Sequence, residues 1–115
     1  MNFKNLDEIT PVPTSHGCGL KKVLLSSDES GTAITQIAVT ELKCGSVVDP
    51  HRHPTMEECF LVCSGKLRMS VRGVMCECGP GCFIRIEAGE EHGLEAVTDC
   101  CIVTVGCATE SEKNE

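Results

Sequence analysis

The sequence predicts an all-β protein, folded as a sandwich or barrel of about eight to ten short strands. Apolar and polar residues alternate along several short segments that are rich in β-branched side chains, as in half-buried strands. Turn residues separate these segments at regular intervals. No stretch longer than one helical turn repeats apolar residues with a helical period. A chain of 115 residues forms one domain, because it is too short to bury two cores.

The first half of the chain contains the clearest strand. Residues 1–19 hold two prolines and two glycines and form an irregular lead-in, in which we interpret His16 as a solvated loop side chain. We expect a strand at residues 20–26, ended by turn residues at 27–31. Residues 32–42 alternate between the two faces and consist largely of β-branched side chains, so they form the next strand.

The second half of the chain predicts shorter strands. Residues 58–64 are apolar on both faces, which predicts a strand buried on both faces. Residues 67–72 alternate, and Arg72 and Gly73 form a hairpin turn into a return strand at 74–78. We expect further strands at 83–87, 94–97 and 100–105. A polar C-terminal tail, residues 108–115, follows them.

Histidines and carboxylates gather in one glycine-framed stretch. His51 and His53 are two residues apart, and in a strand such side chains lie on the same face. Two carboxylates, Glu57 and Glu58, follow after a short turn. A third histidine, His92, ends a second stretch framed by glycines. Imidazole and carboxylate groups together form the ligand set of zinc, iron, manganese and nickel sites.

The spacing of these residues resembles the two sequence motifs of the cupin superfamily. The first motif, G-x5-H-x-H-x(3,4)-E-x6-G, is matched without a gap by Gly45, His51, His53, Glu58 and Gly65. The second motif, G-x5-P-x-G-x2-H-x3-N, is matched at Gly81, Gly89 and His92. Glu87 replaces its proline and Ala96 replaces its asparagine, and both departures lie outside the expected ligand set. The resemblance covers residues 20–107.

The resemblance implies a cupin-type double-stranded β-helix, or jelly-roll barrel, formed by residues 20–107 as one domain. It also implies one divalent transition metal per chain (zinc, iron, manganese or nickel), held by His51, His53, Glu58 and His92. Four protein ligands leave about one or two positions open for water or substrate, as in catalytic sites. Strand alternation does not decide between Glu57 and Glu58 as the carboxylate ligand. The spacing of the cupin motif selects Glu58, and Glu57 remains the alternative.

Four further side chains are candidates for proton transfer or for contact with a substrate. Glu57 and Glu91 flank the expected ligands, and each could act as a general base, although carboxylates in turns are often simply solvated. Arg85 could bind a carboxylate or a phosphate. Alternatively, Arg85 is a surface charge that pairs with Glu87. Met69 could line a pocket or fill the core.

Cupins include isomerases, epimerases, dioxygenases, decarboxylases and binding proteins, so the fold alone does not select a function. We expect a metal-dependent enzyme of the isomerase, epimerase or dioxygenase type. Its substrate would be a small oxygen-rich metabolite, such as a sugar derivative or an organic acid. The alternative is a non-catalytic module that binds or senses a small molecule such as a carbohydrate. The complete ligand set disfavours a metal-free structural barrel.

Composition and charge argue against other classes of function. The net charge is −7 and basic residues do not cluster, so we expect no nucleic-acid partner. No apolar run approaches the roughly 20 residues that span a bilayer, so we expect no membrane partner. Ten cysteines, interpreted as reduced thiols, and an N-terminus without an apolar signal core favour the cytoplasm. We also expect a homodimer, because small barrels often cover an edge strand with a second copy.

Overall fold

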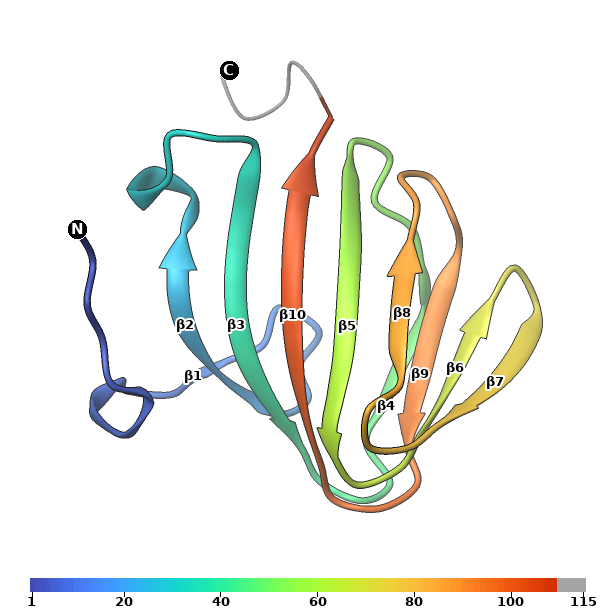
Figure 1. Ribbon diagram of the computed structural model, residues 1–115. Coiled ribbons are helices and arrows are strands. Elements are labelled where there is room, and N and C mark those ends of the chain that lie inside the picture. The colour runs from blue at the N-terminus through green and yellow to red at the C-terminus, as the bar shows by residue number, and fades with distance from the viewer. Residues whose placement is uncertain (110–115) are drawn as a thin grey trace.

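Ten strands form two antiparallel sheets in the computed structural model, which describes residues 1–109 (Figure 1). The six-stranded sheet contains, in spatial order, β1 (Val12–Pro13), β2 (Leu20–Ser26), β3 (Ile34–Leu42), β10 (Cys100–Ala108), β5 (Met56–Ser64) and β8 (Phe83–Ile86). The four-stranded sheet contains β4 (Val47–His51), β9 (His92–Ala96), β6 (Leu67–Val71) and β7 (Val74–Cys78). Two short 3-10 helices, η1 (Leu6–Glu8) and η2 (Ser27–Glu29), lie before β1 and after β2. No helix within these described residues is long and apolar enough to cross a membrane.

The two sheets confirm the predicted fold class. The chain crosses between the two sheets six times, and three of these connections join β3 to β4, β5 to β6 and β9 to β10. Figure 1 shows these three connections at the lower end of the molecule. Repeated crossing between two facing antiparallel sheets gives a double-stranded β-helix, in which each sheet covers the inner face of the other.

Strand alternation places the core on the inner faces of the sheets. On β3, Ala38, Thr40 and Leu42 are buried, and Val39 and Glu41 between them face the other side. We call the main cluster of buried apolar residues the apolar half of the barrel. It consists of Leu42, Phe60, Val62, Leu67, Met69, Cys78, Ile86, Ala96, Cys100 and Ile102.

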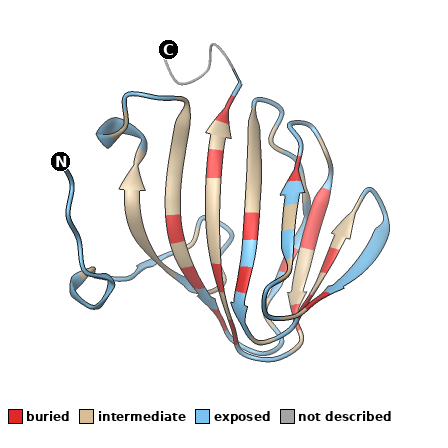
Figure 2. Cartoon of the chain, viewed as in Figure 1, coloured by how far each residue is buried: buried red, intermediate tan, exposed pale blue. Residues whose placement is uncertain are grey.

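The structure corrects the prediction that residues 58–64 are buried on both faces. In β5, Phe60 and Val62 are buried, but Leu61 keeps 42% of its surface exposed and Cys63 is also exposed. Figure 2 shows this alternation along β5. The four-stranded sheet packs against only the inner face of the six-stranded sheet, so apolar residues on the outer face of β5 stay accessible.

Several strand boundaries differ from the predicted ranges. β5 and β9 begin two residues early, at Met56 and His92, because both residues are paired in the ladders, Met56 with Ala108 and His92 with His51. β10 continues to Ala108. Residues 110–115 of the predicted tail lie outside the described residues. The division into a lead-in (1–19), a barrel (20–107) and a tail (108–115) stays a prediction.

The lead-in contains a segment that lies against the interior of the barrel. After β1 has paired with the start of β2, residues 14–18, which we call the strap, form a tight loop. The backbone N–H of Thr14 donates to the carbonyl of Gly19, and that of Gly17 donates to the carbonyl of Thr14. Gly19 has a positive φ, and a Cβ there would lie 2.6 Å from the carbonyl oxygen of Glu41. Only glycine therefore lets the strap approach β3 so closely.

Candidate metal centre

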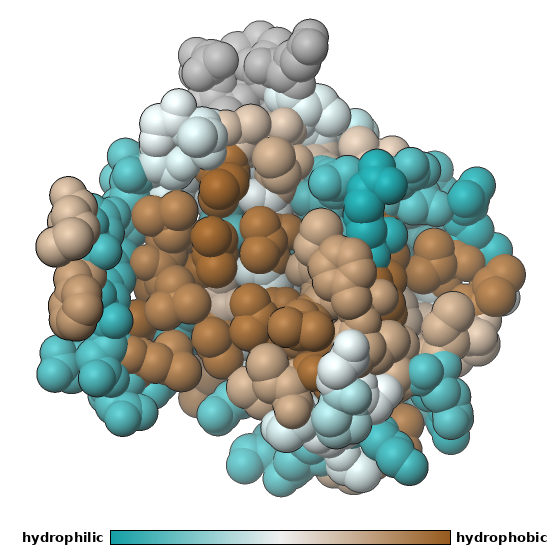
Figure 3. Space-filling view, in the orientation of Figure 1, coloured by the Kyte–Doolittle hydropathy of each residue, from teal (hydrophilic) through white to brown (hydrophobic). Residues whose placement is uncertain are grey.

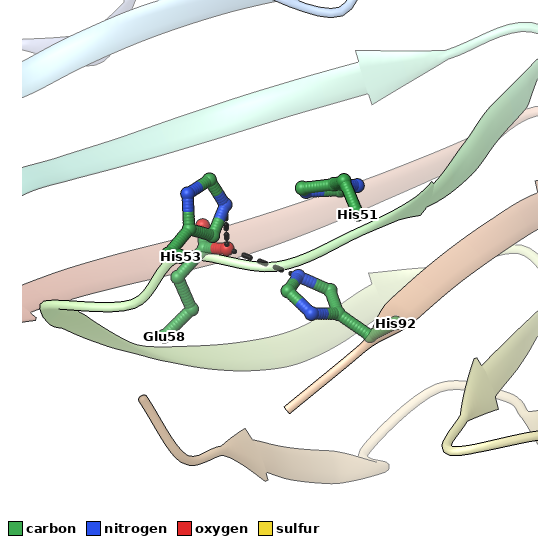
Figure 4. Close-up of side chains that lie close together, drawn as sticks. All are labelled: His51, His53, Glu58 and His92. Carbon is green, nitrogen blue, oxygen red and sulfur yellow. Dashed lines mark hydrogen bonds and ion pairs between the residues drawn. The ribbon is translucent and has the colours of Figure 1, made fainter. Parts of the chain in front are cut away.

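Four side chains from three parts of the fold converge inside the barrel (Figure 4). His51 is the last residue of β4, His53 lies in the following loop, Glu58 lies in β5, and His92 begins β9. One potential ligand atom from each residue lies within 4.8 Å of the others. The structure thus brings together the four residues that the cupin motifs pointed to.

The placement of His53 differs from the prediction that one strand carries both histidines. β4 ends at His51, so strand alternation does not orient His53. The loop is instead held by the N–H of Gly89, which donates to the carbonyl of His53 at 2.9 Å. Both imidazoles still reach the cluster, with ring centroids 4.8 Å apart.

Glu58 links two of the histidines. Its Oε1 lies 3.0 Å from Nε2 of His53 and 3.3 Å from Nε2 of His92. Only the contact with His92 has hydrogen-bond geometry. The ring centroids of His51 and His92 are 4.5 Å apart, because the two residues are directly paired between β4 and β9. The cluster is therefore held by cross-strand pairing as well as by side-chain contacts.

Backbone carbonyls fix the orientation of two imidazole rings. Nδ1 of His51 lies 2.9 Å from the carbonyl oxygen of Asp49, and Nδ1 of His92 lies 2.9 Å from that of Glu90. A carbonyl can only accept a hydrogen bond, so each Nδ1 carries the proton. In the neutral ring, Nε2 then presents a lone pair to the cluster. A carbonyl behind the ring in this way is the usual support of a metal-bound histidine.

Two of the nitrogen atoms in the cluster lack a hydrogen-bond partner. Nε2 of His51 and Nε2 of His53 are both buried and unsatisfied among the described residues. Leaving a buried polar atom unpaired costs roughly 1–3 kcal/mol, so such atoms are rare without a functional reason. A divalent cation would satisfy both nitrogen lone pairs and the carboxylate at once. The donor set of three imidazoles and one carboxylate therefore fits a transition metal.

The electrostatics of the cluster keep Glu58 ionised. Burial by itself raises the pKa of Glu58, but the hydrogen bond from His92 and the nearby charge of His53 outweigh it and hold the pKa below its ordinary value. Burial lowers the pKa of His92, but the hydrogen bonds with Glu58 and with the Glu90 carbonyl raise it above its ordinary value. Nε2 of His92 donates to Glu58 only when the ring carries a second proton. A metal ion and that proton compete for the same lone pair.

A cavity of about 310 Å³ opens beside the cluster, and all four residues line it. The strap forms part of its wall through Thr14, Ser15, His16 and Cys18. The inner faces of β3 and β10 add Gln36, Thr40 and Thr104. The cavity therefore joins a polar cluster to a wall with several hydroxyl and amide groups, which is typical of small-molecule sites.

His16 is an exposed loop side chain, as the sequence predicts, but its closeness to the cluster was not predicted. Its ring centroid lies 4.4 Å from that of His51, and its side chain lines the cavity. Partial burial and the electrostatic influence of His51 lower the pKa of His16. No local pattern marks His16, because its 35-residue separation from His51 belongs to no motif and only the fold brings them together. The one sequence feature that could have drawn attention to His16 is its position between turn residues just before a predicted strand.

The four side chains predicted to transfer protons or contact a substrate do not line the cavity. Arg85 binds Glu57 at 2.7 Å and also contacts Glu87, so Glu57 takes part in an ion pair rather than in the histidine cluster. Glu91 pairs with Arg52. Met69 is fully buried in the apolar half. None of Glu57, Met69, Arg85 and Glu91 is among the residues that line the cavity.

Solved structures similar to this chain share its fold. A predicted oxalate decarboxylase from Thermotoga maritima has a TM-score of 0.82 at 23% identity, with 90% of this chain and 96% of that chain covered. KdgF from Halomonas sp. has a TM-score of 0.81 at 16% identity, with 97% of each chain covered. Ectoine synthase from P. lautus has a TM-score of 0.82 at 21% identity, with 96% of this chain and 80% of that chain covered.

The family comparison agrees with the fold and with the sequence motifs. Comparison with the curated proteins finds no match. Residues 38–106, more than half of the chain, match the Cupin domain family. This segment contains both motifs and all four residues of the cluster. The chain therefore belongs to the cupin family.

Proposed function

We propose that this cupin is a metal-dependent enzyme that acts on a small oxygen-rich metabolite, such as a sugar derivative or an organic acid. The reaction would be of the isomerase, epimerase or dioxygenase type. The observation that carries the proposal is the cluster of His51, His53, Glu58 and His92 at the wall of a 310 Å³ cavity. A cavity of this size accommodates a small metabolite.

In this proposal, the three histidines and Glu58 hold one divalent ion of zinc, iron, manganese or nickel. Bound there, the ion would act as a Lewis acid toward a carbonyl or hydroxyl oxygen of the substrate. The carbonyls of Asp49 and Glu90 keep the rings of His51 and His92 in the orientation that binding needs. The strap, with His16, forms part of the cavity wall.

The similar structures support a small-molecule substrate. One is described as a predicted oxalate decarboxylase, one as an ectoine synthase and a third, from Streptomyces resistomycificus, as the polyketide cyclase RemF. These names belong to proteins under 25% identical to this chain, so they support the class of ligand and not a particular reaction.

A second candidate function is a non-catalytic module that binds or senses a small molecule such as a carbohydrate. One observation favours it: Glu58 is the only carboxylate among the described residues that line the cavity, and it already contacts two histidines. Roles for Glu57 and Glu91 in proton transfer, and for Arg85 and Met69 in substrate binding, stay predictions. Their positions outside the cavity lining give those roles no support.

The outer face of the six-stranded sheet supports a homodimer. One cross-strand row contains Val39, Val103, Leu61 and Phe83, which share this face because directly paired residues do. Phe83 is 62% exposed, and Figure 3 shows a broad apolar surface here. A second copy of the chain would cover it. Sedimentation equilibrium should give twice the 12.3 kDa chain mass, and Phe83→Glu should return the monomer.

We also propose a cytoplasmic location. All ten cysteines lie among the described residues and are free thiols. Burial raises the pKa of several of them, including Cys100 and Cys101, so these thiols are poorly reactive. Such a set of thiols is typical of a reducing compartment.

Elemental analysis of untagged protein tests the proposed metal centre. Wild type should carry about one equivalent of a transition metal, and the double variant His51→Ala/His92→Ala should carry almost none. Wild type that takes up no metal after reconstitution would remove the basis of the proposal. Turnover of sugar phosphates, nucleotide sugars and organic acids, scored beside thermal shift, then separates the two functions. Stabilisation without turnover favours the binding module.

A further inference from the structure

The cavity contains a cation that has no acidic partner among residues 1–109. Lys21 lies on the inner side of β2 and lines the cavity, where its Nζ donates to Oε1 of Gln36 at 3.0 Å. No carboxylate of the described chain lies within ion-pair distance of Lys21. Among the described residues Lys22, Lys43 and Lys66 also lack an ion pair, but of these four lysines only Lys21 lines the cavity. A partly buried ammonium group normally has a counter-charge, because desolvation is costly without one.

The charged groups of the cavity lie in two regions, the histidine cluster and the surroundings of Lys21. Glu58 supplies the only carboxylate that the described part of the chain adds to the lining, and it belongs to the histidine cluster. Lys21 supplies the only permanent cation of the described lining residues. The remaining polar groups near β3 and β10 are neutral hydroxyl and amide groups. The region around Lys21 is therefore suited to an anionic group that comes from outside the chain.

Strand register sets the distance between the histidine cluster and the Lys21–Gln36 pair. Gly106 of β10 pairs with Glu58 of β5 on one side and with Gln36 of β3 on the other. Neighbouring strands are about 4.8 Å apart, so the backbones at Glu58 and Gln36 are separated by about 10 Å. The side chains of Thr35 and Met56 occupy the position that a side chain at Gly106 would take. Glu58 and the Lys21–Gln36 pair nevertheless line the same cavity of about 310 Å³, which has room for a small metabolite.

We propose that the cavity selects small molecules with a carboxylate group, and that Lys21 and Gln36 bind this carboxylate. Nζ of Lys21 and the amide nitrogen of Gln36 each donate a hydrogen bond to it, and the Oε1 of Gln36 keeps Nζ in place. Another oxygen of the same molecule faces the histidine cluster. This inference rests on the proposed function, because it assigns a substrate class to the same cavity. One ammonium and one neutral amide balance a single negative charge, which favours a carboxylate over a phosphate dianion.

Calorimetric titration of zinc-loaded protein in a carboxylate-free buffer tests the proposal. The probes are succinate, succinamide and methyl phosphate. Succinate should bind the wild type and the diamide should not. Lys21→Gln should weaken succinate binding about tenfold to a hundredfold, because it removes one charge-assisted hydrogen bond. The matched control is Lys22→Gln, since Lys22 is the next residue and binds the Leu6 carbonyl instead of lining the cavity. It should leave the affinity unchanged.

Three results would overturn the proposal: succinate that does not bind the wild type, Lys21→Gln protein that binds as tightly as the wild type, and preferential binding of methyl phosphate. Zinc content is measured on every sample after titration. Lys21→Gln should keep its full zinc content, since Lys21 lies outside the cluster. A failure of carboxylate binding with normal zinc content rejects only the carboxylate site. Wild type that takes up none of zinc, iron, manganese and nickel rejects the proposed function.

Discussion

The apolar half of the barrel and the histidine cluster share the strands β5 and β9 but differ in whether their buried atoms have partners. β5 contributes Glu58 to the cluster and Val62 to the apolar half, and β9 contributes His92 and Ala96 in the same way. The apolar half consists of fully buried side chains without polar groups that need partners. The cluster contains two buried nitrogen atoms that remain unsatisfied.

This difference shows how stability and function are separated along single strands. Burial of apolar surface stabilises the fold by about 25 cal/mol per Å². Unpaired polar atoms in the cluster act against stability in the metal-free protein. Because the apolar half supplies the stability, the opposite end of the same strands tolerates a group of residues selected for binding.

Removal of a large side chain from the apolar half should have the largest effect on stability. Leu67 is 1% exposed, so Leu67→Ala should lower the free energy of unfolding by about 2–5 kcal/mol through lost burial and a cavity. Urea unfolding of the metal-free protein measures this loss. Val74→Ala, at an exposed position in the same β6–β7 hairpin, should change stability by less than about 0.5 kcal/mol. A comparable loss in both variants would contradict the assignment of stability to the apolar half.

Removal of a cluster residue should have a different effect: it should abolish the gain in stability that metal binding gives the protein. With free Zn²⁺ at about one hundred times its Kd, binding should stabilise the wild type by about 2.7 kcal/mol. His92→Ala should lose most of this increment, since it lacks one of four ligands. Thermal unfolding with and without Zn²⁺ measures it. Arg52→Ala, which alters an exposed ion pair with Glu91, is the control and should keep the increment. Equal zinc stabilisation in His92→Ala would disprove the ligand role.

Acid should release the metal from the cluster while the apolar half remains folded. The metal needs imidazole lone pairs, and protons compete for them, so bound metal is retained at high pH and lost as pH falls through the histidine range near about 6. The raised pKa of His92 moves the onset of this competition to higher pH than for a free histidine. Metal content after dialysis at a series of pH values measures the transition, with circular dichroism as the control for folding. Full metal content well below this range would argue against histidine ligands.

The smallest expected effect lies outside both regions, at the ion pair of Lys4 and Glu29. Hydrogen bonds from Lys4 and from the Ser26 backbone lower the pKa of Glu29 to about 2 from an ordinary value of 4.5. A lowered pKa stabilises the fold above pH 4.5, and this contribution is lost as pH falls toward about 2. Glu29→Gln should flatten the pH dependence of stability slightly in this window and leave the metal content unchanged. An unaltered pH dependence would mean that solvent screens the pair completely.

The sequence motifs identified the cluster residues, but strand alternation could not identify the carboxylate ligand. Spacing within one motif identified His51, His53 and Glu58, and a second motif added His92. Alternation could not decide between Glu57 and Glu58 on physical grounds, because both faces of the strand carry apolar residues. In the structure, Glu58 contacts the histidines and Glu57 pairs with Arg85. The register of β5 against β8 and β10 determines this outcome.

By itself, the sequence determined most of the strands and turns, because alternation and glycine placement act over a few residues, and its resemblance to the cupin motifs pointed to the cluster. Only the tertiary structure decided which distant segments share the cavity. His16 in the strap, Lys21 in β2 and Gln36 in β3 line it because the sheets close on one another. The same closure left the outer face of β5 uncovered. Local periodicity specifies the direction of a side chain relative to its own strand, whereas its neighbours depend on long-range pairing that no local pattern contains.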